Sequence, residues 1–495
     1  MIGTLKAIGY SDGQLFVHML VFALVIGLLG GLLGCALGWW LARGMTAIYR
    51  QFFQFPVLDA QFYPSIHALG LSISLGCSVL GGLRGSRAVL RLRPAEAMRP
   101  KPPRQGGAIW LESVGWFWRP LSSGWRMVIR NVVRNRVRSL AGTFAAAMGA
   151  AILVNSFMIA KSPYYLLDFQ FRWIMHNDLE LLFRDERSQA ALGEAARLPG
   201  VDYAEPVLSV ACTFRNGPHS KKGSLTGLVQ NARLTVPRDL NARPIRIPAS
   251  GIAINRKLAE VLHVRPGDWL VMEPVKGLRQ AQRVQVAEIS DSYLGMAAYA
   301  EIGFLSRLIG EELVLTGVQL ALDGDAANRR ALYRQLKQMP ALQAVTARSD
   351  MVQSIEETVL RNQWVVICLL VLFAGVVFFA SILNASLVSL AERQREVATL
   401  RVLGYGPWHV GSLLFRESMI TTLSGSVLGM PLGYLLTVIT AKEYESEMFR
   451  LPIVTSGSMW IGTVVLAVLF GVLAQLAVQR SIHTMNWLDA LKAQE

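Results

Sequence analysis

The histidines and cysteines are the residues of this chain best suited to metal or nucleophilic chemistry, and their spacing supports neither. The seven histidines are scattered without an HExxH pattern, and the four cysteines form no CxxC pair. Metal sites are typically built from ligands at short, fixed spacings on one helix or turn. We therefore expect no metal site. Ser290, Asp291 and Ser292 could be read as hydrolase groups, but nothing in their spacing supports catalysis.

A phosphate-binding loop is also absent from the sequence. Its backbone cradle requires the order GxxxxGK[ST], whereas residues 217–224 carry a glycine and lysines in the wrong order. We therefore expect no enzyme activity and no cofactor in this chain. Any ATP hydrolysis would be carried out by a separate subunit that binds the nucleotide.

Long apolar runs, rather than polar clusters, dominate the rest of the chain. Hydrophobic residues make up 52% of its 495 residues and charged residues 17%, against about 25% charged in soluble domains. About 20 apolar residues cross roughly 30 Å of hydrocarbon. The sequence therefore excludes an ordinary soluble protein and predicts a polytopic α-helical membrane protein. The six expected spans are 16–42, 61–83, 140–160, 364–388, 418–441 and 459–478.

The basic connector between the second and third spans indicates the topology. Residues 84–138 hold thirteen Lys and Arg against two acids, a net charge of +11. Short basic loops stay cytoplasmic, so both termini should be cytoplasmic, in a multi-pass cell (inner) membrane protein with residues 161–361 outside. Because the basic run 126–138 is amphipathic and enters a span, we expect it to lie on anionic lipids and not on nucleic acid.

Residues 161–361 are long enough for a domain with its own core. Residues 188–197 and 327–339 are expected to be helices, and 342–346 a strand, which fits a pair of βαβ halves. Short alternating segments over 215–289 predict a small β-rich subdomain between them. The expected fold of this insert is α+β, and the favoured interpretation is a folded module without chemistry of its own.

An internal repeat relates the two ends of the chain. A shift of 395 residues places TLKAIGY at 4–10 on TLRVLGY at 399–405. The same shift superposes two glycine triplets, which put small residues on one helix face and permit close helix approach. We weigh two roles for them, a sliding seam between the two membrane units and static packing. The expected packing residues are Gly30, Gly34, Gly38, Gly425, Gly429 and Gly433.

The run ERQREVATLRVLGY at 392–405 combines charged helix formers with apolar residues three apart. This pattern predicts an amphipathic helix at the inner membrane face, ended by Gly404. A solvated linker is the alternative that composition alone would favour. Recurrence of the block at residues 4–10 favours the helix.

This block, followed by a glycine-spaced span, resembles the signature of the FtsX-like permease family of ABC transporters, which includes MacB-type and lipoprotein-releasing permeases. The LxVxPGDW stretch at 262–269 and the paired βα halves are similar to that family's extracytoplasmic domain, so the insert is expected to be of the MacB-like periplasmic core type. The resemblance implies that residues 392–404 form a coupling helix for a cytoplasmic ABC ATPase dimer. The implied contacts are Glu392, Arg393, Glu396, Leu400, Arg401, Leu403 and Gly404, with a remnant of the same helix at Thr4, Leu5, Lys6, Gly9 and Tyr10.

The expected domain order follows from the repeat. Residues 1–105 form the C-terminal half of a first FtsX-like unit, 106–139 a basic connector, 140–160 a span, 161–361 the outer domain and 362–495 the rest of a second unit. Because residue 2 aligns inside the coupling motif, the chain is expected to be an N-terminally truncated two-unit member. The missing half would be a gene-model error, a second permease chain, or lost.

Two functions follow from the resemblance. The first is the permease subunit of an ABC transporter, which couples a separate ATPase to motion of the outer domain for export, efflux, or release of lipoprotein or lipid by mechanotransmission. A periplasmic adaptor is a further implied partner. The alternative is a regulatory FtsX-like subunit without a translocated substrate, which activates an envelope enzyme such as a cell-wall hydrolase. The cargo and the oligomeric state do not follow from the sequence.

Overall fold

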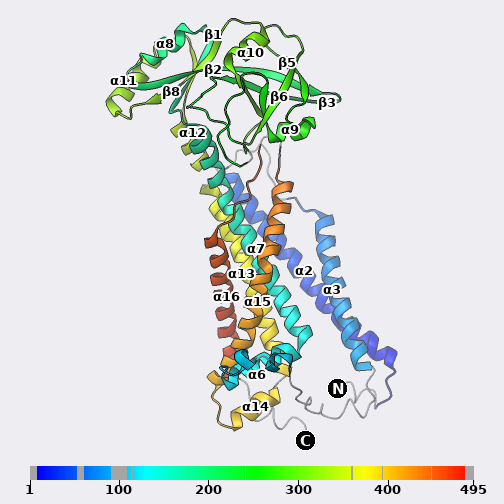
Figure 1. The fold of residues 1–495 in the computed structure, drawn as a ribbon. Helices are drawn as coiled ribbons and strands as arrows, with labels where there is room; N and C mark the ends of the chain where they lie inside the picture. Colours follow the sequence, from blue (N-terminus) through cyan, green and yellow to red (C-terminus); the bar gives the residue numbers. More distant parts are fainter. Residues whose placement is uncertain are drawn as a thin grey trace. The chain divides into compact units, whose positions relative to one another are not determined.

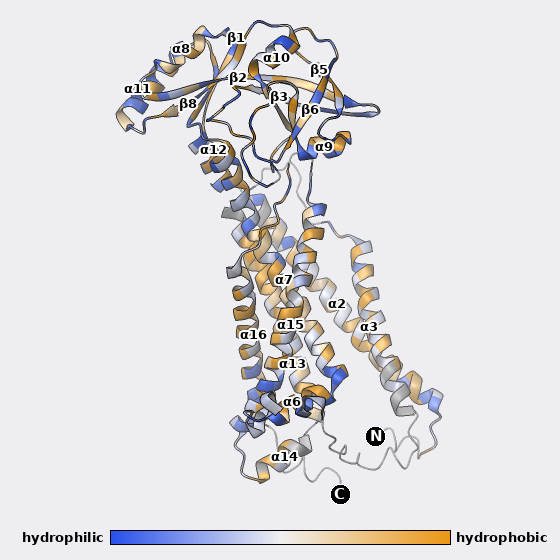
Figure 2. Ribbon diagram, in the orientation of Figure 1, coloured by the Kyte–Doolittle hydropathy of each residue, from blue (hydrophilic) through white to orange (hydrophobic). Residues whose placement is uncertain are grey.

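A computed structural model describes residues 8–52, 61–90, 109–113, 115–239, 241–357, 361–392, 394–446 and 449–484. The chain divides into two compact units, Met1–Trp110 (unit 1) and Leu111–Glu495 (unit 2). Six helices in the described residues are long and apolar enough to cross a membrane. Five of them contain a predicted span whole and most of these extend well beyond it, whereas the sixth begins at Pro64, three residues into the predicted span 61–83. Figure 2 shows hydrophobic residues along their length.

Unit 1 consists of two long helices, α2 (Asp12–Phe52) and α3 (Pro64–Leu90), which pack along each other. Ser11 and Gln14 cap the start of α2 reciprocally, since each side chain accepts a hydrogen bond from the other residue's backbone N–H, at 3.3 and 3.0 Å. Small residues bring the helices together: Ser74 Oγ on α3 donates to the Gly27 carbonyl at 2.8 Å.

Unit 2 contains a helix bundle and the insert domain at one end of it (Figure 1). Alanines, Phe378 and Phe470 fill the middle of the bundle, where Gly149 and Gly375 make room for the two aromatic rings. The long helices are α7 (Arg136–Asp168), α13 (Arg361–Glu392), α15 (Pro407–Glu443) and α16 (Gly457–Thr484). The short ones are a 3₁₀ helix η1 (Trp110–Ser113), α5 (Gly115–Trp118), α6 (Ser123–Arg134) and α14 (Gln394–Val402). The predicted basic helix is α6, and it ends before α7 because Asn135 leaves the helical conformation (φ −92°, ψ 54°).

The insert domain follows a π-helical turn, η2 (Phe169–Ile174), at the end of α7. It contains two sheets that share one long strand. Its elements are β1 (Leu179–Ser188), α8 (Ala190–Ala196), β2 (Val201–Asn216), β3 (His219–Leu228), β4 (Ile252–Asn255), α9 (Arg256–Leu262), β5 (Trp269–Pro274), β6 (Gln282–Ser290), β7 (Ala297–Glu301), α10 (Ile302–Ile309), β8 (Val314–Leu322), α11 (Ala326–Leu336), β9 (Leu342–Ala347) and α12 (Arg348–Ile355).

The first sheet confirms the predicted βαβ halves. Strands β2, β8, β1 and β9 lie in that order and pair antiparallel, with α8 joining β1 to β2 and α11 joining β8 to β9. This is the split βαβ arrangement of ferredoxin-like folds. The expected helices at 188–197 and 327–339 are α8 and α11, and the expected strand at 342–346 is β9.

The second sheet closes on itself, because β2, β3, β7, β4, β6 and β5 pair in a ring that returns to β2. The prediction of a β-rich subdomain over 215–289 was right in kind but too short at both ends. Residues 208–216 of β2 and all of β7 belong to the ring. One strand that serves two sheets carries no break in its sequence pattern, so the boundary could not be read from it.

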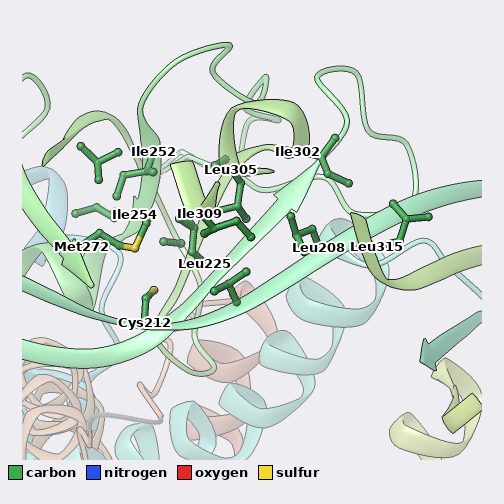
Figure 3. Close-up of a cluster of buried hydrophobic side chains, with 14 of the residues drawn as sticks. Leu208, Cys212, Leu225, Ile252, Ile254, Met272, Ile302, Leu305, Ile309 and Leu315 are labelled. Atoms are coloured by element: carbon green, nitrogen blue, oxygen red, sulfur yellow. The ribbon is translucent and has the colours of Figure 1, made fainter. Parts of the chain in front are cut away.

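The core of the insert domain, part of which Figure 3 shows, is mostly aliphatic and extends from inside this ring to the first sheet. Its Cys212 is 2% exposed, and burial raises the pKa of the thiol to about 12. The thiol therefore packs as a small apolar side chain and is not a nucleophile at neutral pH.

Candidate functional site

Helix α14 lies at the end of the bundle opposite the insert domain (Figure 1). Val397 and Ala398 are buried, and Leu400 is half-buried, one turn from Val397. Val397 and Leu400 pack with Val410 and Leu414 of α15. Residues three or four apart share one helix face, so α14 is held to the bundle by its apolar face, as its amphipathic pattern predicts.

A glycine ends α14, as predicted. Gly404 has φ +91°, and the Tyr405 N–H donates to the Leu400 carbonyl at 3.0 Å. A left-handed glycine with this six-residue hydrogen bond is the Schellman ending of helices. Gly9, its equivalent in the repeat, has φ +105°. The chain then restarts at Pro407, the first residue of α15.

The segment between the two helices presents an apolar surface, which we call the apolar turn (residues 402–408). Val402, Leu403 and Trp408 are 60%, 70% and 66% exposed, and Tyr405 is also exposed. Trp408 is held by an edge-on contact with the His483 ring of α16, with ring centres 5.7 Å apart. The turn therefore projects large side chains outward from a base fixed in the bundle.

The implied coupling residues are only partly in this surface. Leu403 and Gly404 lie in the apolar turn, whereas Leu400 faces the bundle. Exposed Val402, Tyr405 and Trp408 were not singled out, although the sequence signal for them was available: large apolar residues on both sides of the glycine. Glu392, Glu396 and Arg401 are described only by their backbone, and Arg393, Thr4, Leu5 and Lys6 lie outside the described residues. In unit 1, Tyr10 is exposed.

Helix α6 lies across a small cavity from α14. Met127, Val128 and Asn131 of α6 line a cavity of about 30 Å³ together with Val397 and Leu400 of α14. The remaining wall consists of Val410, Leu413, Leu414 and Glu417 of α15. Helices α6, α14 and α15 therefore meet around one small cavity.

A buried ion pair connects α15 to α7 just beyond this cavity. Arg138 Nη2 lies 2.7 Å from Glu417 Oε1, and the two side chains are 18% and 12% exposed. Ser389 of α13 and Thr422 of α15 line the adjoining pocket. Ionisable residues inside a membrane bundle are costly unless paired, so this contact fixes how the two helices meet.

The second glycine triplet lies along the same interface. A Cβ at Gly425 would be 2.6 Å from the Thr143 carbonyl, and one at Gly433 would be 2.6 Å from Val154 Cβ. At Gly429 it would collide with the Ala147 carbonyl. The glycines thus let α15 touch the α7 backbone.

The expectation that this triplet forms a seam between the two membrane units is therefore wrong. Its contacts lie within unit 2. Its partner is α7, the helix that enters the insert domain. Gly30, Gly34 and Gly38 have no described atom within 4 Å of an added Cβ. In α2 the glycines that meet α3 are Gly27 and Gly31, one face away.

Metal chemistry finds no support in the described part of the chain. Its residues contain no group of three or more His, Cys, Asp or Glu that could hold an ion. The features that stand out are mechanical: a surface at one end of the bundle, a close helix seam, and a domain at the other end.

Comparison with known proteins gives the class to which these features belong. Residues 1–94 and 367–486 match the family model described as FtsX-like permease, C-terminal. A curated relative, the macrolide export ATP-binding/permease protein MacB of Shewanella sp. (strain ANA-3), is 25% identical over 273 residues. The aligned part is 54% of this chain but only 39% of that relative.

Two solved structures are similar to part of the chain. The periplasmic region of MacB from Actinobacillus actinomycetemcomitans is 10% identical, with a TM-score of 0.28, over 38% of this chain and 97% of that one. The extracellular domain of the noncanonic ABC-type transporter YknZ from Gram-positive bacteria is 15% identical, with a TM-score of 0.25, over 34% and 97%.

The chain is thus a multi-pass membrane protein of the permease class, with an α+β domain inserted between two of its helices. Two segments of its membrane part, residues 1–94 and 367–486, are similar to FtsX-like permeases, and its curated relative is a MacB-type export ATP-binding/permease protein.

Proposed function

We propose that this chain is the membrane-spanning permease subunit of an ABC transporter, in which ATP hydrolysis by a separate cytoplasmic ATPase moves the insert domain. The observation that carries the proposal is the apolar turn. Large exposed side chains stand at the end of α14, while the helix itself is packed against α15. A force applied to this turn therefore reaches α15, the helix that packs against α7 through its glycine triplet.

The proposed orientation follows from charge. The basic connector and the apolar turn face the cytoplasm, both termini lie on that side, and the insert domain is extracytoplasmic. Arg130 on α6 lies near this end, and its hydrogen bond with Glu112 raises the pKa of the guanidinium, which stays charged at every physiological pH. Permanent positive charge on an amphipathic helix favours anionic lipid headgroups.

The apolar turn is the proposed docking surface for the ATPase, with Leu403 at its centre and Val402, Tyr405 and Trp408 around it. The charged residues Glu392, Arg393, Glu396 and Arg401 are proposed to surround it as polar contacts, and Gly404 to set its shape. Central apolar anchors with a polar rim are typical of protein interfaces. The first-unit segment at Thr4, Leu5, Lys6, Gly9 and Tyr10 is proposed to serve the second ATPase of a dimer.

Co-purification tests this proposal. The tagged full-length chain is solubilised from its native membrane, and the bound ATPase is identified by mass spectrometry and measured by its nucleotide hydrolysis. Leu403→Asp should weaken ATPase binding by roughly 30-fold, since loss of a central anchor costs about 2 kcal/mol. Trp269→Asp is the matched control, because Trp269 is a comparably exposed apolar residue (60%) on the insert domain.

Retention of the ATPase by Leu403→Asp and by a Trp408→Asp variant would reject the docking surface. Recovery of an envelope hydrolase with the chain, and no cargo, would favour the regulatory alternative, for which the same ATPase contact would serve.

A further inference from the structure

The loop between α15 and α16 (residues 444–456) has no peptide connection to the insert domain, because the chain enters that domain from α7 and leaves it toward α13. The described residues of this loop nevertheless contact the domain at several points. These contacts converge on residues 291–294, which follow strand β6, and on the first turn of α9.

Asp291 is the central residue of these contacts. Its side chain is only 6% exposed and is shared by two arginines, Arg256 of α9 at 3.5 Å and Arg450 of the loop at 3.4 Å. The Asp291 N–H also donates to the Arg238 carbonyl at 2.7 Å, which fixes its backbone. A carboxylate so buried requires compensating charge, and one of its two partners comes from the membrane part of the chain.

The backbone of the loop pairs with the same segment. The Arg450 N–H donates to the Tyr293 carbonyl at 3.1 Å, and Leu294 and Phe449 form an antiparallel bridge. The Arg450 guanidinium also lies over the Tyr293 ring, 5.0 Å from its centre. Burial and then the Asp291 charge raise the pKa of Tyr293, which keeps the phenol neutral beneath the cation.

A second ion pair lies one residue further along α9. Lys257 Nζ is 2.7 Å from Glu445 Oε1, and both side chains are about three-quarters buried. Arg256 and Lys257 therefore hold the loop at two points, Arg256 through the shared Asp291 and Lys257 directly. Because Arg256 and Lys257 are adjacent on a short helix, their two contacts fix both the position and the orientation of the loop relative to α9.

The end of α7 meets the same place. The Tyr293 ring packs edge-on against Phe169, at 4.9 Å between centres, and against Tyr165, at 5.9 Å. Phe169 begins the π-helical turn η2, and such turns often mark functional positions. Further down α7, the Ser162 hydroxyl donates to the Pro452 carbonyl of the loop at 2.6 Å.

We infer that Asp291, held between Arg256 and Arg450, forms with the Lys257–Glu445 pair a non-covalent joint through which α15 and α16 position the insert domain, with Arg450 as the positioning residue. Removal of Arg450 leaves Asp291 with Arg256, so the domain keeps its fold while the loop loses one of its two charged contacts with the domain. The inference that this joint transmits motion rests on the proposed function. The inference that it holds the domain in position is independent of that function.

Disulfide trapping in the purified full-length chain tests the attachment. The native cysteines are replaced by alanine, and Leu294→Cys is combined with Phe449→Cys, a bridged pair within reach of a disulfide. Oxidation should cross-link the parent rapidly. Arg450→Glu should slow cross-linking at least tenfold and Arg450→Lys less, whereas Arg334→Glu, on the exposed face of α11, should leave it unchanged. Near-UV circular dichroism checks that the domain stays folded.

A charge exchange provides the second measurement. Lys257→Glu and Glu445→Lys should each slow cross-linking about threefold or more, and the double variant should recover most of the parent rate. Unchanged cross-linking in Arg450→Glu and in both single exchanges would overturn the joint. None of these measurements uses an ATPase, so their failure is distinct from failure of the docking surface.

The transmitting role has its own readout. With the co-purified ATPase present, nucleotide should change the cross-linking rate in the parent at least twofold, and this response should disappear in Arg450→Lys. A joint that is only a structural tether would give the same rate with and without nucleotide in the parent, and that result would overturn the transmitting role.

Discussion

Helices α2 and α15 are equivalent in the internal repeat, but they use their glycines differently. In α15 the triplet at 425, 429 and 433 touches the α7 backbone, whereas in α2 the triplet at 30, 34 and 38 has no described atom close to it. The residues of α2 that approach α3 lie on a face other than the triplet. They are Gly27 and Gly31, which correspond in the repeat to Thr422 and Ser426 of α15.

This difference shows that a stripe of small residues on a helix allows another helix to approach closely. The stripe does not by itself determine whether a partner helix packs there. The partner of α15 is α7, which also carries the chain into the insert domain. The same contrast holds for charge. Glu417 of α15 pairs with Arg138 of α7, while its repeat equivalent in α2 is Phe22, which is 66% exposed. The seam with α7 therefore combines close packing with a specific ion pair.

The largest effect is expected at the ion pair. Arg138→Met should destabilise unit 2 by about 3 to 5 kcal/mol, because it leaves the buried Glu417 carboxylate without its arginine. SDS-titration unfolding in mixed micelles measures this loss. The double variant Arg138→Met with Glu417→Met should lose much less, and Phe22→Ala in α2 should be close to neutral. Equal losses in the single and double variants would show that the pair does not hold the seam.

A smaller effect, of opposite sign in the two helices, is expected at the triplets. Gly429→Ala should destabilise unit 2 by about 1 to 3 kcal/mol, since the new methyl group meets the Ala147 carbonyl. Gly34→Ala, at the equivalent position, should be neutral or slightly stabilising, because alanine favours a helix over glycine. The same unfolding assay compares them. If both variants lost stability equally, the contrast between α2 and α15 would be wrong.

The smallest effect is expected at the two glycines that behave alike. Gly404 and Gly9 both adopt positive φ, with no described atom within 4 Å of an added Cβ. Alanine at either position should therefore cost only the left-handed backbone penalty, about 1 to 2 kcal/mol. Hydrogen exchange of the Tyr405 amide should accelerate roughly tenfold in Gly404→Ala. Unchanged exchange at this amide would mean that the helix end does not depend on the glycine.

Much of the fold was predictable because its signals are local. Charge-free runs predicted six spans, and the ends of α8, α11 and β9 lie within three residues of the predicted ones. The glycine that ends α14 was also predicted, since a left-handed turn selects glycine. The closed ring of strands was not predictable in extent, because β2 is one strand shared between two sheets.

The apolar turn lies at the end of the predicted amphipathic helix, but most of its exposed residues were not predicted. Periodicity put Leu400 and Leu403 on one apolar stripe, but the bundle uses Val397 and Leu400, and the exposed residues extend past the glycine to Trp408. The sequence of an apolar stripe does not show which of its residues are covered by neighbouring helices. That depends on where α15 and α16 lie.

By itself, the sequence determined that this protein crosses the membrane, which helices repeat, and where α14 ends, because hydrocarbon thickness and backbone conformation act on neighbouring residues. The tertiary structure decided which glycines contact a neighbouring helix, which carboxylates are paired and which loop holds the insert domain. Arg138 and Glu417 are 279 residues apart and Asp291 and Arg450 are 159 residues apart. No local pattern joins such residues, since only the tertiary packing of distant segments brings opposite charges to within 4 Å of each other.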